Sequence, residues 1–446
     1  MSLYLTLPGV ALGDADGGEE HRFLKVRDQV GDPENVFFEV QYSGKTPMWL
    51  AGHFWCDGSD DRWNDDVHYM GGSMMFDNVS WPSSMFGWLA AAPDPAVVGD
   101  AWQEMWRSRI ENADFWFRQW GGHQPRDDYW RTASVHDRYA NVGVPVFIMS
   151  GWQDGYKNPV AHVISGLAAL GKETAGLIGA WRHKYPFNGY PGPRVDWLAY
   201  IVTHWWDRWL KGTTPPAEDT WPQLTAWLGS SKEPNRSACA DDGGRWIAED
   251  GAWQTRVTPK VLYLGPGNRL GDAPERATYA SSGQPVLDTE MLETSSWGEC
   301  GNDDLPGDQA RFDRESLYFD SEPLPAELDC FGYPEVQLTL KLDRPIAALA
   351  IRLCEISPET GASHLVTYRF FNPAYRGGDM AKPQAIEPGE TRHADPQGLR
   401  QRPLSIWRPA SGPLGRSGRR REFPDGDRRP ALACGLHSID HNPRTP

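Results

Sequence analysis

The sequence predicts an α/β domain built on a parallel sheet, followed by an all-β domain. Between residues 56 and 212, apolar strand patterns alternate with amphipathic helical patterns, which is typical of parallel strands joined by helices. From about 220 to 388, short β-like runs recur between turns rich in Gly, Pro and Asp, which indicates a β-sandwich or jelly roll.

The first part of the α/β region predicts one strand and the helices around it. In Asp94–Trp120, apolar residues recur every three or four positions, which predicts one or two amphipathic helices. Val144–Met149 is an apolar run of strand length. Asn158 and Pro159 then suit the N-cap and first position of a helix that Gly171 ends.

A second strand and helix follow in the same order. Ala175–Trp181 predicts a buried strand, and Arg194–Gly212 predicts a strongly amphipathic helix with its tryptophans on the buried side. Before this region, Val36–Tyr42 predicts a single strand in an otherwise mixed N-terminal segment.

The all-β region is predicted from six strand-like runs. Glu335–Leu342 alternates apolar and polar residues, as a half-exposed antiparallel strand does. The six runs are Pro222–Leu228, Lys260–Gly265, Ser316–Ser321, Glu335–Leu342, Ala348–Ile356 and His364–Phe371.

Charge and cysteine content exclude several classes of protein. The formal net charge of −16 opposes binding to a phosphate backbone, so we expect no nucleic-acid partner. The six cysteines form no CxxC pair, which predicts reduced, mostly buried thiols. No convincing signal peptide and no membrane-length apolar run occur, so we expect a soluble, cytoplasmic protein without a membrane partner. The sequence leaves the oligomeric state open.

The C-terminal segment differs in composition from the rest of the chain. Residues 391–446 contain eleven Arg, no Lys and eight Pro. Stretches such as Arg416–Pro430 have neither a helical nor a strand period. We therefore predict a disordered Arg/Pro-rich tail.

Two residues carry the chemistry that the sequence suggests. Asp154 follows the strand predicted at Val144–Met149, and His183 follows the strand predicted at Ala175–Trp181. Functional groups of parallel α/β sheets lie just past the carboxyl ends of strands. An acid followed by a histidine matches the last two members of the Ser-acid-His order of α/β-hydrolases. Asp154 would orient the imidazole, and His183 would take the proton of a serine.

The sequence contains no G-x-S-x-G motif, in which the nucleophile would normally lie. Ser59, Ser73 and Ser150 come nearest, but none has small residues on both sides, so turn or capping roles are predicted for them. The expectation is therefore a hydrolase that is impaired because its nucleophile is missing.

Metal and cofactor sites are not predicted. The Asp-rich stretch Cys56–Gly72 has neither the register of a calcium loop nor an HxH or HExxH pattern, so it is interpreted as a solvated acidic loop. A metallohydrolase built on this loop and a non-catalytic jelly-roll module that binds sugar or peptide remain the alternatives.

Several longer motifs resemble the CocE/NonD hydrolases, which are related to the X-Pro dipeptidyl-peptidases. They are DDVHYMGG, PVFIMSGWQDGYKN, GLIGAWRHKYP, WWDRWLKG, VLYLGPG and DLPGDQ. The resemblance implies an α/β-hydrolase domain with a helical cap at about 75–140, then a jelly roll. It implies hydrolysis of acyl esters, amides or short peptides without a cofactor, with Asp154 as the triad acid and His183 as the triad base.

Combined with the patterns above, the resemblance predicts four regions. They are an unmatched segment at 1–55, an incomplete α/β-hydrolase domain at 56–215, an all-β jelly-roll domain at 216–390 and the tail at 391–446. Because the resemblance stops abruptly at both ends, we expect the chain to be a fragment, a degraded gene product or the result of frame errors.

Overall fold

The computed structural model describes most of the chain between residues 53 and 394 and three short strands outside it. The predicted strand Val36–Tyr42 lies outside the described residues, as do residues 196–204 of the helix predicted at Arg194–Gly212. The described residues are 2–3, 53–56, 58–64, 67–132, 134–187, 192–195, 205–213, 222–231, 233–234, 243–249, 259–280, 306–326, 328–332, 334–394, 407–408 and 432–439.

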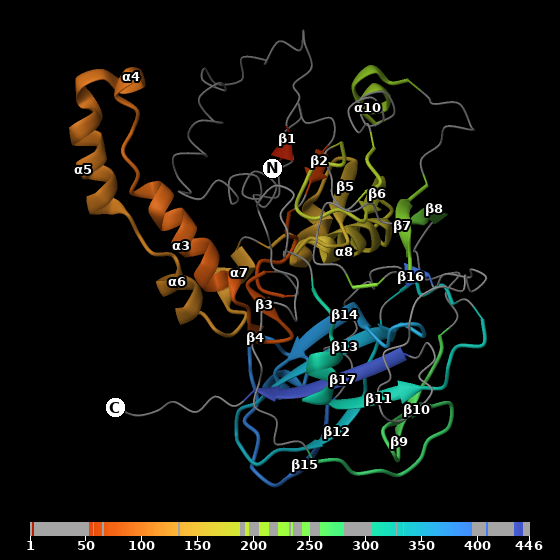
Figure 1. Ribbon diagram of the computed structural model, residues 1–446. Coiled ribbons are helices and arrows are strands. Elements are labelled where there is room, and N and C mark those ends of the chain that lie inside the picture. Colours follow the sequence, from red (N-terminus) through yellow and green to blue (C-terminus); the bar gives the residue numbers. More distant parts are fainter. Residues whose placement is uncertain are drawn as a thin grey trace.

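A seven-stranded sheet organises the first part of the chain (Figure 1). Its centre is parallel, with the strand order β2-β5-β6-β7. Strand β1 lies antiparallel beside β2, and β7 also pairs with β8 and β16. The strands are β1 (Ser2–Leu3), β2 (His53–Cys56), β5 (Val146–Gly151), β6 (Thr174–Gly179), β7 (Leu224–Ser230), β8 (Gly244–Glu249) and β16 (Trp407–Arg408).

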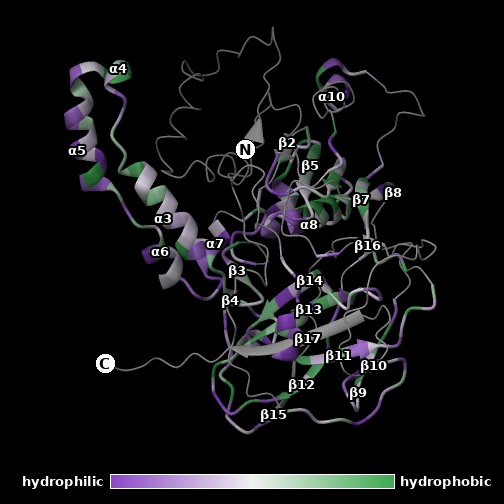
Figure 2. Ribbon diagram, in the orientation of Figure 1, coloured by the Kyte–Doolittle hydropathy of each residue, from purple (hydrophilic) through white to green (hydrophobic). Residues whose placement is uncertain are grey.

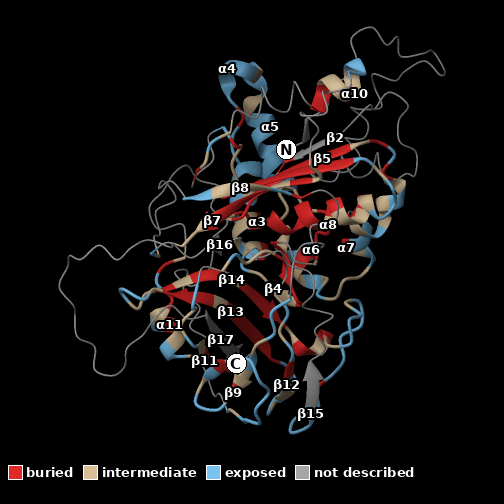
Figure 3. Ribbon diagram, turned by 90° about the vertical axis from the view of Figure 1, so that its right-hand side faces the viewer, coloured by how far each residue is buried: buried red, intermediate tan, exposed pale blue. Residues whose placement is uncertain are grey.

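The buried strands β5 and β6 confirm the predicted strand-helix-strand order. Every residue of both strands is buried (Figure 3). Helix α8 (Lys157–Ala168) joins them and packs its apolar side, including Val160 and Leu167, into the same core. It begins at Lys157, one residue before the predicted N-cap, and Asn158 and Pro159 lie in its first turn. Because β5 and β6 are parallel, the carboxyl ends of both strands lie at one edge of the sheet.

Several helices fill the chain between β4 and β5. The segment predicted as one or two helices forms α4, α5 and α6 instead. Helices α3, α4 and α5 extend away from the body (Figure 1), and α5 mixes hydrophobic and hydrophilic residues around its surface (Figure 2). No residue of α5 is buried, so its apolar spacing does not correspond to a core-facing side. The helices are α3 (Asp77–Leu89), α4 (Pro95–Val98), α5 (Trp102–Asn112), α6 (Phe117–Gly122), α7 (Asp128–Thr132) and the 3₁₀ helices η1 (Gly99–Ala101) and η2 (His136–Asn141).

The second part of the chain forms a six-stranded sheet with the order β14-β13-β17-β11-β10-β9, and a two-stranded sheet of β12 and β15. Strand β12 alternates buried and more exposed residues and pairs antiparallel, as predicted. Short helices α11 (Ala310–Arg314) and η5 (Pro373–Tyr375) accompany these sheets. The strands are β9 (Tyr263–Gly265), β10 (Arg269–Gly271), β11 (Leu317–Ser321), β12 (Leu338–Lys341), β13 (Ala348–Ile356), β14 (Ser363–Phe371), β15 (Thr391–Ala394) and β17 (Leu432–Ile439).

Two assignments made from the sequence differ from the structure. Leu224–Ser230, expected in the all-β domain, pairs with β6 and extends the first sheet instead. Within the predicted disordered tail, 391–394, 407–408 and 432–439 form strands. The strand at 432–439 has the sequence LACGLHSI, which is apolar enough to pair between β11 and β13 although its flanks are rich in Arg and Pro.

A short hairpin connects the two parts. Strands β3 (Tyr69–Met70) and β4 (Ser73–Met74) flank a turn at Gly71, which has a φ of +55°. The Gly71 carbonyl accepts a hydrogen bond from the backbone N–H of Asn372. A Cβ at Gly71 would lie 2.3 Å from the carbonyl oxygen of Phe370, so only glycine permits this approach.

Helix α10 (Asp207–Lys211) is the described part of the helix predicted near residue 200. Trp205 and Trp206 just before it are buried against the first sheet, in agreement with the predicted buried side. Among the described helices, none combines the length and the apolar character that a bilayer crossing requires. Three cysteines in the described residues, Cys56, Cys330 and Cys354, are not in disulfide bonds.

Candidate active site

The loop after β5 positions Asp154 at the carboxyl edge of the parallel sheet. Trp152 donates its backbone N–H to the Gly179 carbonyl, and Gln153 donates its own to the Trp181 carbonyl. These bonds hold the loops after β5 and β6 together. Gly151 makes this possible, because a Cβ there would lie only 1.8 Å from the carbonyl oxygen of Trp181. The two strand ends therefore meet closely enough for their side chains to interact.

Asp154 and His183 are in contact, as their sequence positions predicted. The Nδ1 atom of His183 lies 3.1 Å from Oδ2 and 3.3 Å from Oδ1 of Asp154. Asp154 is 2% exposed, whereas the His183 side chain is 23% exposed. A carboxylate that accepts the Nδ1 proton keeps the Nε2 atom of a neutral imidazole free to act as a base.

Further donors hold the carboxylate of Asp154 in place. The backbone N–H of Tyr156 donates to Oδ1 over 3.0 Å, and the Ser150 hydroxyl donates to Oδ2 over 3.1 Å. The ring of Tyr156 also lies beside the imidazole of His183, with 5.6 Å between centroids. Several hydrogen-bond donors hold a buried carboxylate in one orientation.

The three serines that come nearest to a nucleophile motif do not bond to His183. Ser150 donates to Asp154 instead. The hydroxyl oxygens of Ser59 and Ser73 are buried and have no hydrogen-bond partner among the described residues. The resemblance would place the nucleophile elbow at residues 40–55, of which 40–52 lie outside the part of the chain that the structure describes.

The two aspartates of the Asp-rich loop that the structure describes are buried, whereas the composition of the loop suggested that it is solvated. Asp60 and Asp61 are both 2% exposed. Asp61 pairs with Arg126, whose Nη2 atom lies 2.9 Å from Oδ2 of Asp61. Arg126 also bridges to Asp137 at 2.9 Å. Burial of these carboxylates is tolerated because each has charged or polar partners.

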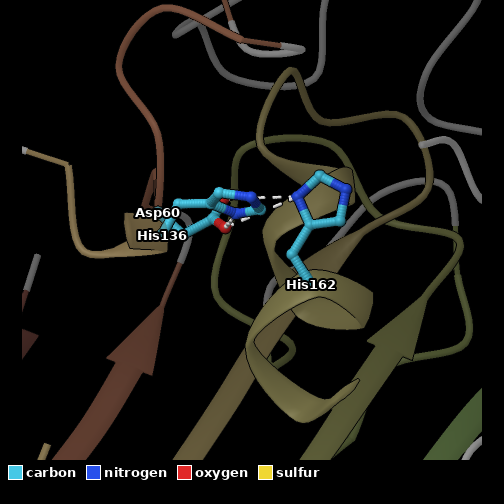
Figure 4. A group of neighbouring side chains, drawn as sticks. All are labelled: Asp60, His136 and His162. Carbon is cyan, nitrogen blue, oxygen red and sulfur yellow. Dashed lines mark hydrogen bonds and ion pairs between the residues drawn. The ribbon is translucent and has the colours of Figure 1, made fainter. Parts of the chain in front are cut away.

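Asp60 lies in a second cluster of titratable side chains, with His136 and His162 (Figure 4). Burial alone would raise the pKa of Asp60, but the charge of His162 and hydrogen bonds with both imidazoles hold that pKa well below its ordinary range. Burial alone would lower the pKa of His136, but its hydrogen bond with Asp60 and the carboxylate charge raise it to about 9.

No sequence pattern predicted this cluster, because its three residues lie far apart in the chain. Asp60 is separated from His136 by 76 positions and from His162 by 102 positions. No local motif links these residues, because each belongs to a different loop or helix. The only sequence signal was the density of Asp in the loop, and that signal does not distinguish a buried residue from a solvated one.

Comparison with known proteins assigns both parts of the chain to one family. Residues 53–185 match the model of the X-Pro dipeptidyl-peptidase S15 family. Residues 225–396 match the model of the X-Pro dipeptidyl-peptidase C-terminal non-catalytic domain. Together these matches span more than half of the chain. No curated protein sequence matches it.

Solved structures with low sequence identity share the fold. An aminopeptidase from a marine sediment archaeon, Thaumarchaeota archaeon, is 16% identical with a TM-score of 0.59, and the match covers 86% of this chain and 64% of that chain. An α-amino acid ester hydrolase is 16% identical with a TM-score of 0.61, covering 90% and 67%. A CocE/NonD family hydrolase from Staphylococcus aureus is 11% identical with a TM-score of 0.54, covering 93% and 66%.

The chain thus spans about two thirds of the length of these proteins. The matched segments contain the residues that frame the candidate site, since Asp154 and His183 both lie within 53–185. From these two family matches and the shared fold, we conclude that the chain belongs to the X-Pro dipeptidyl-peptidase S15 family of hydrolases and carries its C-terminal non-catalytic domain.

Proposed function

We propose that Asp154 and His183 are the acid and base of a serine-hydrolase active site for acyl ester, amide or short-peptide substrates. The observation that carries this proposal is the 3.1 Å contact between His183 Nδ1 and Asp154 Oδ2 at the ends of adjacent parallel strands. In such a site, the Nε2 atom of His183 takes the proton of the nucleophilic hydroxyl and later returns it to the leaving group.

We further propose that the chain is impaired as a hydrolase. A Ser-His-acid triad acts as a unit, so an acid and a base without a serine lose nearly all of its catalytic advantage. The absence of a G-x-S-x-G motif and the hydrogen bond of Ser150 to Asp154 support this part of the proposal.

The finer assignments of the fold are part of the same proposal. We assign the α-helices between β4 and β5 as the cap region, because they occupy residues 77–132, within the segment where the resemblance implies a cap. We assign the sheets after residue 259 as a jelly roll, because most of their pairings are antiparallel. Both assignments agree with the family resemblance.

The test is labelling of the full chain with a fluorophosphonate probe, with adducts mapped by mass spectrometry. The variants are Asp154→Ala and His183→Ala. The control is His123→Ala, because His123 forms another His–Asp contact, with Asp127, in which both side chains are about 40% exposed. Hydrolysis of 4-nitrophenyl esters and of an X-Pro 4-nitroanilide is measured in parallel.

We expect no serine adduct and no turnover above the rate in buffer. A single labelled serine that is lost in His183→Ala but kept in His123→Ala would contradict the proposed impairment and support the role of His183. A labelled serine that persists in both Asp154→Ala and His183→Ala would contradict the proposed roles of these two residues. A low-field Nδ1 proton resonance that is absent in Asp154→Ala tests the Asp–His contact independently of activity.

A saturable sugar or peptide ligand whose binding survives Asp154→Ala and His183→Ala would favour the alternative, a binding module without catalysis.

A further inference from the structure

Three potential metal ligands converge outside the Asp154–His183 site. Asp60 lies in the loop after β2, His136 begins η2, and His162 lies on α8. The side chains point toward one another from these three segments (Figure 4). Their ligand atoms all lie within 4.8 Å of one another.

The distances between the ligand atoms suit a small tetrahedral ion. Oδ2 of Asp60 lies 3.0 Å from Nδ1 of His136 and 3.5 Å from Nδ1 of His162. Zinc binds imidazole nitrogen and carboxylate oxygen at about 2.0–2.2 Å, which places neighbouring tetrahedral ligands about 3.3 Å apart. The two distances to Asp60 lie on either side of that value, so the carboxylate needs little movement relative to either imidazole.

The donor set also indicates which kind of metal would bind. Two imidazoles and one carboxylate suit zinc and similar first-row transition metals, whereas calcium and magnesium prefer an all-oxygen set. Asp60 is 2% exposed and the side chain of His162 is 8% exposed, so both ligands are held in the protein interior.

Neighbouring groups orient the carboxylate, as hydrogen-bond partners of metal ligands usually do. The hydroxyl of Tyr139 donates to Oδ2 of Asp60 over 2.5 Å. The backbone N–H of His136 donates to the backbone carbonyl of Asp60 over 2.9 Å, which fixes the loop against η2. The Asp60 carboxylate is therefore positioned before any ion arrives.

An ion has a route to the cluster. The side chain of His136 is 29% exposed and lines an open pocket of about 290 Å³. The same pocket is lined by the carboxylates of Asp61, Asp137 and Asp379, and Arg126 and Arg131 there pair with the first two.

The geometry points to a binding site for Zn²⁺ formed by Asp60, His136 and His162, with water in the fourth position. The ion would join the loop after β2, the 3₁₀ helix η2 and helix α8. Without a metal, both imidazoles and the Tyr139 hydroxyl share the single carboxylate of Asp60. An ion would relieve this competition, because each imidazole would then bind the metal with a nitrogen lone pair.

The test uses the full chain without a histidine tag, treated with EDTA and dialysed. Zinc binding is measured by calorimetry, the zinc content by elemental analysis and the melting temperature with and without added zinc. The variants are His136→Ala and His162→Ala. His123→Ala is the matched control, because His123 contacts a carboxylate but belongs to no metal-ligand group among the described residues.

We expect one zinc per chain, a higher melting temperature with zinc, and a loss of affinity on the order of 100-fold or more in both variants. His123→Ala should bind as tightly as the unmodified chain. Co²⁺ should give the intense visible bands of a tetrahedral site, and these should disappear in His162→Ala.

Stoichiometric binding that persists in both histidine variants, or no binding by a folded chain, would overturn the proposal. His136→Ala keeps the test decisive if His162→Ala fails to fold, because the side chain of His136 is 29% exposed whereas that of His162 is 8% exposed. None of these readouts depends on hydrolase activity, so their outcome is independent of the role of His183.

Discussion

Ser150 and Asp154 are joined by a hydrogen bond of 3.1 Å within the loop after β5. The oxygen of Asp154 that accepts this bond is Oδ2, the same atom that lies 3.1 Å from Nδ1 of His183. Ser150 therefore supports the carboxylate and is not positioned as the nucleophile of the site. Ser150 comes near a nucleophile motif in the sequence, but in the structure its hydroxyl is bonded to the Asp154 carboxylate.

Replacing Ser150 should reduce stability by a measurable amount. Ser150→Ala removes one donor from the buried carboxylate of Asp154, and we expect a loss of about 1–2 kcal/mol in the free energy of unfolding. Urea denaturation followed by circular dichroism measures this loss. Ser84→Ala is the control, because the exposed hydroxyl of Ser84 bonds only to a carbonyl of its own helix. Equal stability of the two variants would contradict the prediction.

A methyl group at Gly151 should disturb the Asp154–His183 site, although Gly151 is not itself a candidate catalytic residue. The Cβ of Gly151→Ala would lie 1.8 Å from the carbonyl oxygen of Trp181, so the loops after β5 and β6 must separate. We expect a loss of about 3 kcal/mol or more and weakening of the Asp154–His183 contact.

Gly87→Ala provides the control for this substitution. Gly87 lies in α3, and a methyl group added there would meet no atom within 4 Å, so alanine should stabilise the helix by about 0.5–1 kcal/mol. Thermal unfolding of both variants measures the difference. If Gly151→Ala raised stability, as Gly87→Ala is expected to do, the ends of β5 and β6 would not approach each other as closely as the structure shows.

The turn at Gly71 should be essential for contact between the two parts of the chain. Gly71→Ala combines a positive φ with a methyl 2.3 Å from the Phe370 carbonyl oxygen. We expect a loss of about 3 kcal/mol or more, with earlier proteolysis between the two parts. Gly171→Ala has a similar φ of +68° but no atom within 4 Å, so it should lose only about 1 kcal/mol. Equal losses would mean that the contact with Phe370 contributes nothing.

Glu355 should make stability fall as the pH rises. Burial, and to a lesser extent the charge of Glu233, raise its pKa in the folded chain to about 7, although Ser231 donates a hydrogen bond to it. The unfolded chain releases this proton near pH 4.5. Between pH 4.5 and pH 7 the folded chain holds a proton that the unfolded chain has released. The free energy of unfolding therefore falls as the pH rises toward 7.

Glu355→Gln should remove this dependence. Its carboxamide keeps an acceptor for Ser231 but does not ionise, so its melting temperature should fall less between pH 5 and pH 8, by roughly 2 °C or more. Melting curves of both proteins at several pH values measure this. Glu359→Gln, an exposed control on the following turn, should follow the unmodified chain. Parallel pH profiles for Glu355→Gln and the unmodified chain would refute the prediction.

Sequence patterns predicted the features that depend on residues close together in the chain. The apolar runs that form β5 and β6, the amphipathic helix α8 between them and the family motifs all depend on neighbours in the chain. The rule that parallel strands end at one edge then predicted that Asp154 and His183 would meet. Their catalytic roles stay a prediction.

The sequence patterns did not predict which strands pair with one another. Leu224–Ser230 has the same apolar character whether it joins the first or the second sheet, and its partner β6 alone places it in the first. The strand at 432–439 was missed because its composition was averaged with Arg- and Pro-rich flanks, although it pairs with β11 and β13.

Local periodicity and contiguous motifs in the sequence were enough to predict the family, the α/β order and the placement of Asp154 and His183 at neighbouring strand ends. The packed fold was needed to reveal that Asp60 is buried and that it meets His136 and His162. The physical reason is that burial and convergence depend on how distant segments pack, and side chains 76 and 102 positions apart leave no common pattern in the sequence.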